Sequence, residues 1–165
     1  LNIAGYTPLE SATGLFWINI TMLISYFIWG YILPKISEYG LSSVKLIKLG
    51  LPISYFSLFL IIYFGNHSGA FLFTIYIVTS IVISLTQPAI ALNFPKNLAG
   101  KSLTSYNVFL FSGTFFIQWG IGLVIDFCSN KGFDVLSSYR ISFSLFLILC
   151  VLSYFFFVYL NRNEN

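Results

Sequence analysis

Long apolar stretches separated by short polar segments dominate the pattern of this sequence. Each stretch has about 19 to 25 residues, enough for a helix rising about 1.5 Å per residue to cross about 30 Å of hydrocarbon. The stretches lie at residues 12–33, 46–64, 70–92, 103–127 and 141–160. Only Lys48 and Asp126 carry charge within these limits, and both lie close enough to a helix end to reach the interface. The pattern predicts an all-α, polytopic membrane helix bundle with five transmembrane helices in a single domain, 1–165.

The composition agrees with this prediction. The 165 residues are 58% hydrophobic, 20% aromatic and 8% charged, whereas roughly a quarter of the residues in a soluble domain are charged. An ordinary water-soluble domain is therefore excluded, and the lipid bilayer is the first expected partner. No basic run interleaved with aromatic residues indicates that the chain binds nucleic acid.

The placement of the basic residues predicts the orientation, because Lys and Arg stay on the cytoplasmic side of a membrane. Most of them follow the first, third and fifth stretches: Lys35, Lys45, Lys48, Lys96, Lys101 and Arg162. Only Lys131 and Arg140 belong to the opposite side. We therefore expect the N-terminus outside and the C-terminus in the cytoplasm. An odd number of spans with an outside start, together with the missing initiator Met, is the pattern expected for the last five helices of a twelve-helix protein.

Polar side chains are confined to three of the five stretches. Residues 46–64 and 141–160 have no amide or acid in their interiors, so we expect much of their circumference to face lipid. In the other three stretches polar residues recur at helical spacing, and side-chain amides in hydrocarbon need protein partners or water. The candidate lining of a substrate pathway is Asn19, Ser84, Gln87, Asn107, Thr114 and Gln118. The alternative is that these groups only bond neighbouring helices, an interaction worth about 0.6 to 2 kcal/mol each.

Pro88 follows Gln87 directly in the third stretch. Proline has no N–H, so the Ser84 carbonyl loses its usual partner and the helix is expected to kink there. Interrupted helices beside polar stripes are common where transporters bind solutes, although kinks also occur without such a role.

Residues that carry catalytic chemistry are not grouped in this sequence. The one histidine, His67, belongs to the short turn 65–69, and Glu10, Asp126 and Asp134 lie at or beyond the ends of the stretches. The thiols of Cys128 and Cys150 have neither a histidine nor a second cysteine at metal-ligand spacing. We therefore expect no enzyme activity, no metal site and no cofactor.

Two segments carry a resemblance to a known family. Gly30 and Lys35, followed by Gly40, Lys45 and Lys48, resemble a degenerate copy of the cytoplasmic loop motif of the major facilitator superfamily of secondary transporters. Gly30 matches the leading glycine of the motif and Lys35 its base, whereas Pro34 stands in place of its acid. Residues 94–101 and the helix after them are similar to a loop and the eleventh helix of bacterial members.

The resemblance implies that the spans are helices eight to twelve, a partial facilitator-type half in a bacterial inner (plasma) membrane. Helices eight, ten and eleven then border the central cavity, nine and twelve are peripheral, and Gly30 and Lys35 belong to a gating loop. The implied function is part of a secondary active transporter or facilitator that moves a small polar solute by alternating access. Its partners are the solute and the missing N-terminal helices, without which no transport is expected. The alternative is a non-catalytic integral membrane subunit that packs against a partner membrane protein.

Overall fold

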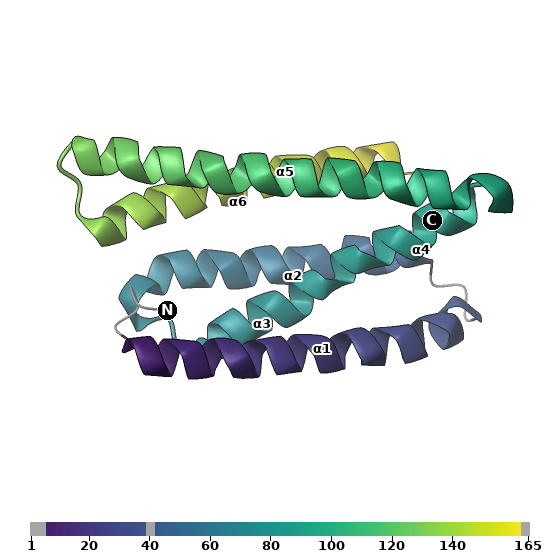
Figure 1. The fold of residues 1–165 in the computed structure, drawn as a ribbon, viewed down its shortest axis with the longest axis horizontal. Helices are drawn as coiled ribbons and strands as arrows, with labels where there is room; N and C mark the ends of the chain where they lie inside the picture. Colours follow the sequence, from purple (N-terminus) through teal and green to yellow (C-terminus); the bar gives the residue numbers. More distant parts are fainter. Residues whose placement is uncertain (1–5, 39–41, 163–165) are drawn as a thin grey trace.

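The computed structural model describes residues 6–38 and 42–162, and within these ranges it is built of helices and short connections, without strands (Figure 1). Five helical segments are long and apolar enough to cross a membrane, as predicted. The elements in chain order are α1 (Pro8–Glu38), α2 (Ser43–Phe64), η2 (Gly65–His67), α3 (Ala70–Ser80), η3 (Ile81–Leu85), α4 (Thr86–Asn93), α5 (Lys96–Asn130) and α6 (Val135–Leu160), where η denotes a 3₁₀-helix. The third span thus comprises three elements, α3, η3 and α4.

Three helices begin before the predicted spans and are capped by polar residues: α1, α2, where the Ser42 hydroxyl accepts from the Lys45 N–H at 3.2 Å, and α6. At the start of α1, the backbone N–H of Thr7 donates to the Glu10 carboxylate at 2.9 Å, and the Glu10 N–H donates to the Thr7 hydroxyl at 3.3 Å. This is a capping box, which satisfies backbone donors of the first turn. At the start of α6, the Asp134 carboxylate accepts from the Ser137 N–H at 3.1 Å. Helical structure therefore extends beyond the hydrocarbon-length segments.

The helices form two layers. Figure 1 shows α1, the third span and α5 in the nearer layer, with α2 and α6 behind them. The third span runs diagonally, so that α3 packs against α1 and α4 packs against α5. In the rear layer α2 contacts α6, and α5 and α6 pack together as a hairpin. Helices α1 and α5 therefore lie at opposite edges of the nearer layer.

Helix α2 is the most buried span. In the most apolar stretch of α2, 33% of the residues are buried, compared with none in α5. Ile47 and Leu51 of α2 form the core cluster with Val82 and Leu85 of η3. The prediction that residues 46–64 have much of their circumference in lipid holds for one face, where Leu49, Ile53, Phe56, Phe59 and Tyr63 are exposed, whereas the other face packs against α3, η3, α4 and α6. Lack of strongly polar groups does not distinguish a helix surrounded by lipid from one surrounded by other helices.

A proline in α2 creates the polar link to α6. Pro52 has no N–H, so the carbonyl of Lys48 lacks its usual partner one turn later. The hydroxyl of Tyr154 in α6 donates to that carbonyl at 2.8 Å. The Lys48 ammonium in turn donates to the backbone carbonyl of Asn161, just past the end of α6. One end of α2 is therefore joined to the end of α6 by two hydrogen bonds.

Candidate functional site

The third span departs from α-helical geometry at η3, just before Pro88, where the sequence predicts a kink. The chain tightens from α3 into a 3₁₀-helix and resumes as α4 at Thr86. The Thr86 N–H is shared between the carbonyls of Ile83 and Ser84, and its hydroxyl donates to the Ile83 carbonyl at 2.7 Å. Because Pro88 cannot donate to the Ser84 carbonyl, these shorter-range hydrogen bonds replace an α-helical one. The irregular backbone lies against α2, where Ile81, Val82 and Leu85 are buried.

Three of the six predicted pathway residues lie at or beside this interruption: Ser84 within η3, Gln87 in α4 and Asn107 in α5. The hydroxyls of Thr86 in α4 and Tyr106 in α5 are hydrogen-bonded at 2.6 Å. Gln87 and Asn107 each lie one residue from this bond. Ser84 and Asn107 are half-buried, whereas Gln87 is exposed. The structure therefore brings the polar part of the third span beside the polar part of α5.

The other predicted residues are farther away. Thr114 and Gln118 are exposed farther along α5, and the Thr114 hydroxyl donates to its own helix, to the Leu110 carbonyl, at 2.8 Å. Asn19 is exposed on α1, at the opposite edge of the layer, and its amide donates to the Leu15 carbonyl at 2.7 Å. The six residues thus occupy the three spans of one layer: α1, the third span and α5. None of them lines either of the two cavities described below.

The amides on these helices lack partners from other helices in the part of the chain that the structure describes. The Gln87, Asn107 and Gln118 side chains make no hydrogen bond to a described residue. The Asn19 amide bonds only within its own helix. The interhelical amide bonds that were the simpler alternative for these residues are therefore not formed among residues 6–38 and 42–162.

The segment that resembles a gating loop is helical. Gly30 and Lys35 both lie within α1, which continues to Glu38, so the prediction that the helix ends before Lys35 is wrong. The Lys35 ammonium donates to the Tyr31 hydroxyl at 2.8 Å and lies 4.1 Å from the centre of the Tyr31 ring. Such a pair four residues apart stabilises a further helical turn. Gly40 lies outside the described residues, and the gating role remains a prediction.

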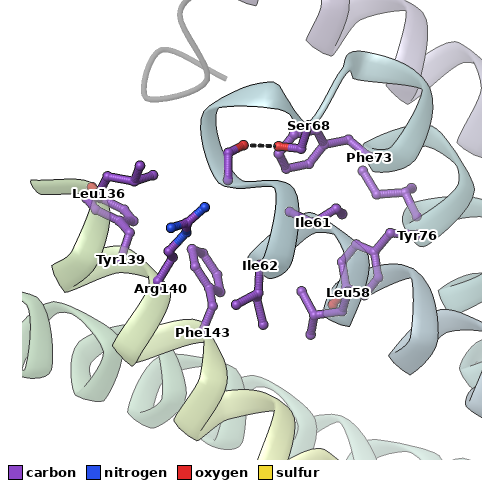
Figure 2. A pocket seen from close by; sticks show the side chains of 12 residues that line it. Leu58, Ile61, Ile62, Ser68, Phe73, Tyr76, Leu136, Tyr139, Arg140 and Phe143 are labelled. Atoms are coloured by element: carbon purple, nitrogen blue, oxygen red, sulfur yellow. Dashed lines mark hydrogen bonds between the residues drawn. The ribbon is translucent and has the colours of Figure 1, made fainter.

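One cavity contains a charged side chain that the sequence did not single out. It has a volume of about 350 Å³ and lies between α2, η2, α3 and α6 (Figure 2). The guanidinium of Arg140 donates from Nη2 to the Tyr63 carbonyl at 3.1 Å, and its Nε is buried without a hydrogen-bond partner among the described residues. The lining is otherwise mainly apolar and aromatic: Leu58, Ile61, Ile62, Gly65, Ser68, Phe73, Tyr76, Ile77, Leu136, Tyr139 and Phe143.

A second cavity of about 390 Å³ lies between α5 and α6. Ser142 is its one polar lining side chain, and that hydroxyl donates to the Ser138 carbonyl of the same helix at 2.9 Å. The rest of the lining is glycine and apolar side chains, such as Phe116 and Leu145. This cavity therefore has no unengaged polar side chain to orient a ligand.

Capping signals in the sequence could have located two of the features that hydropathy missed. The spacing Thr7-x-x-Glu10 is that of a capping box, and in the structure Glu10 caps α1. Asp134 before an apolar run marks a helix start, which puts Arg140 inside α6 rather than in the preceding loop. Hydrogen bonds from the side chain and the backbone N–H of Ser137 lower the pKa of the Asp134 carboxyl. The contact of Arg140 with Tyr63 has no comparable local signal.

Comparisons with known protein families, curated proteins and solved structures found no match to this chain. Function is therefore inferred from the chemistry and placement of its own residues. In architecture, the chain is an all-helical integral membrane protein, with five helices long and apolar enough to span the bilayer.

Proposed function

We propose that this chain is part of a secondary active transporter or facilitator that moves a small polar solute by alternating access. One observation carries the proposal. The three spans that hold side-chain amides form one layer of the molecule, and their amides have no partner on another described helix. An unpartnered amide in hydrocarbon costs several kcal/mol, on the order of 2 to 7, so such a layer favours contact with water or with a polar solute.

The proposed pathway is centred on the interrupted third span. Irregular backbone at membrane depth is tolerated where it is buried in protein or lines a cavity, and in transporters it often adjoins the solute site. Here η3 packs on α2, while Gln87 and Asn107 lie beside it on α4 and α5. Amides donate and accept hydrogen bonds, and Asn19, Ser84, Thr114 and Gln118 add further polar groups, none of them charged. A small uncharged polar solute fits this set best.

The resemblance to the facilitator superfamily supplies the proposed context. In a facilitator-type transporter, the nearer layer of this chain would face the remaining helices of the protein. Helices α2 and α6 would then lie on the side of this chain that faces away from those helices. The basic residues favour an outside N-terminus, and the resemblance implies a bacterial inner membrane. Gly30 and Lys35 would act at the cytoplasmic end of α1, where Lys35 is held against Tyr31.

A second candidate function is that of a non-catalytic membrane subunit whose nearer layer packs against a partner protein. The exposed aromatic side chains of α5 favour it, because Phe109, Phe115 and Trp119 lie on the same helix as the amides. A dry interface could bury these rings and pair the amides at the same time.

Cysteine accessibility tests the pathway and separates the two candidates. The native cysteines are first replaced by Cys128→Ala and Cys150→Ala in the full-length protein. Single cysteines are then introduced as Ser84→Cys, Gln87→Cys, Thr114→Cys and Gln118→Cys, and their reaction with a charged, water-soluble thiol reagent is timed in membranes. A water-filled pathway is expected to give reaction at these positions, because only thiols in water ionise and react.

Phe156→Cys provides the matched control, since Phe156 is 64% exposed on the apolar surface of α6 and is expected to face lipid. Reaction at the four polar positions about tenfold faster than at Phe156→Cys would support the pathway. A tenfold ratio of rates corresponds to a difference of about 1.4 kcal/mol in activation free energy. If all four react as slowly as the control, the layer is dry and the transport proposal fails in favour of the packing subunit.

A further inference from the structure

We call the cavity between α2, η2, α3 and α6 the Arg140 pocket. Its volume and the distribution of its polar groups suit an amphiphile. Figure 2 shows the Arg140 side chain extending from α6 toward the turn that holds Ser68, with Phe143, Ile62 and Leu58 below it. Its volume of about 350 Å³ lies within the range of small-molecule sites, roughly 300 to 1,000 Å³. One end of the pocket is therefore cationic, and the rest is mainly apolar and aromatic, with Ser68, Tyr76 and Tyr139 as its hydroxyl-bearing side chains.

The guanidinium of Arg140 is incompletely satisfied. Nη2 bonds the Tyr63 carbonyl, Nε is buried without a described partner, and Nη1 makes no hydrogen bond with a described residue. No carboxylate in the described parts of the chain forms an ion pair with it, and Asp134, the acid at the start of the same helix, is engaged by Ser137. A partly buried cation with one neutral acceptor retains much of its desolvation cost, which an anionic group would offset.

The backbone at Gly65 leaves room for this cation. Gly65 has φ of +56°, and a Cβ built there would lie 2.5 Å from Arg140 Nη2 and 2.9 Å from Nε. Only glycine combines this backbone conformation with the close approach of the guanidinium. The turn between α2 and α3 thus holds the charge at the rim of the pocket, where α2 ends, while Leu58 lines the pocket about 10 Å deeper along α2.

We propose that the Arg140 pocket binds an anionic amphiphile, with the carboxylate or phosphate on Arg140 Nη1 and the acyl chain among the apolar side chains. A free long-chain carboxylate and an anionic phospholipid share this chemistry. The charge lies at the end of the helices and the apolar cavity extends toward the bilayer core, which matches the order of headgroup and chain in a membrane. The site is separate from the six residues of the proposed solute pathway, so each proposal can fail without the other.

Equilibrium binding of radiolabelled dodecanoate to the purified full-length protein, in nanodiscs of zwitterionic phosphatidylcholine, tests the proposal. Saturable binding is expected, and Arg140→Gln is expected to weaken it about tenfold or more, because a charge-assisted hydrogen bond is lost. Lys131→Gln removes the exposed base in the turn before α6 and should change affinity by less than about twofold, as expected for a surface charge. Absence of saturable binding, or equal losses in both variants, would overturn the proposal.

Three further measurements guard against a misfolded Arg140→Gln protein, test the role of the charge and identify the source of the ligand. Ile62→Trp keeps Arg140 and fills the cavity, so it should also abolish binding; normal binding by this variant would contradict the site. Dodecanol has the same chain without the charge and should bind about tenfold more weakly than dodecanoate. Competition by phosphatidylglycerol added to the nanodiscs would identify an anionic phospholipid as occupant. Dodecanoate binding that resists this competition would identify a free carboxylate.

Discussion

Tyr154 supports a carbonyl that Pro52 leaves without a helical partner. The Tyr154 hydroxyl donates to the Lys48 carbonyl at 2.8 Å across the α2–α6 contact. Tyr154→Phe should lower the free energy of unfolding in detergent by about 1–3 kcal/mol, the cost of a buried acceptor without a partner. Tyr159→Phe is the control: Tyr159 is 64% exposed, its hydroxyl has no hydrogen bond to a described residue, and little change is expected.

A double-mutant cycle separates this hydrogen bond from packing of the tyrosine ring. Pro52→Ala restores an N–H that can bond the Lys48 carbonyl within α2, so Tyr154→Phe should cost less in that background. Equal costs of Tyr154→Phe in the two backgrounds would show that the carbonyl is not what Tyr154 stabilises.

The cap of α6 makes stability depend on pH. Hydrogen bonds from Ser137 lower the pKa of Asp134 below its ordinary value of 3.8, so the ionised carboxylate stabilises the folded state. This contribution to stability is complete at pH values well above 3.8. It is lost as the pH falls below 3.8 and passes the pKa that Asp134 has in the folded state, because the carboxylate is then protonated. The melting temperature of Asp134→Ala should therefore lie below that of the unaltered protein at pH 7, and the difference should narrow toward pH 3.

Asp126→Ala controls for the general effect of removing an acid near the same end of the bundle. Asp126 is exposed and makes no contact with a described polar group, so its replacement should have little effect on melting at either pH. A difference for Asp134→Ala that stays constant between pH 7 and pH 3 would refute the role of the ionised cap.

At the scale of elements, the approach of η3 to α2 depends on Gly50. A Cβ on Gly50 would lie 2.9 and 3.0 Å from the two methyl carbons of Val82, whose branched side chain has little rotamer freedom. Gly50→Ala should therefore destabilise the protein by about 1–3 kcal/mol through overpacking. The measurement is thermal or denaturant unfolding in detergent.

Gly113→Ala is the matched control on α5, because a Cβ there meets nothing within 4 Å. Alanine favours helix over glycine by up to about 1 kcal/mol, so this variant should be neutral or more stable. Val82→Ala removes the methyl carbons that Gly50→Ala would strike, and the double variant should lose less stability than the two single losses added together. Simple additivity would contradict the proposed clash.

At the scale of the whole molecule, the orientation in the membrane is open to a direct test. The α2–α3 and α5–α6 turns lie at the same end of the bundle, at the left of Figure 1. The positive-inside rule predicts this end outside. In a background without Cys128 and Cys150, Lys131→Cys should react with a membrane-impermeant reagent in intact cells. Asn97→Cys, at the opposite end, should react only after permeabilisation, and the reverse pattern would contradict the orientation.

The sequence predicted the number of spans because a backbone in hydrocarbon must satisfy its own hydrogen bonds, which leaves helix as the state of each long apolar run. It also predicted a kink at Pro88, since a missing N–H is a local property of the chain, and the irregular segment η3 lies just before that residue. It placed helix ends less well where caps extend them, as at Thr7 and Asp134. Hydropathy does not register the hydrogen bonds that start a helix.

By itself, then, the sequence determined that the chain is an all-helical membrane protein and which spans carry polar groups, because length, hydropathy and proline act locally. Only the tertiary structure decided that α2 is the most buried span and that Gln87 and Asn107 lie on adjacent helices. It also decided that Arg140 reaches Tyr63, 77 residues earlier in the chain. Such contacts depend on which helices pack together and on where a glycine or a proline lets them approach, and no periodicity along one helix contains that information.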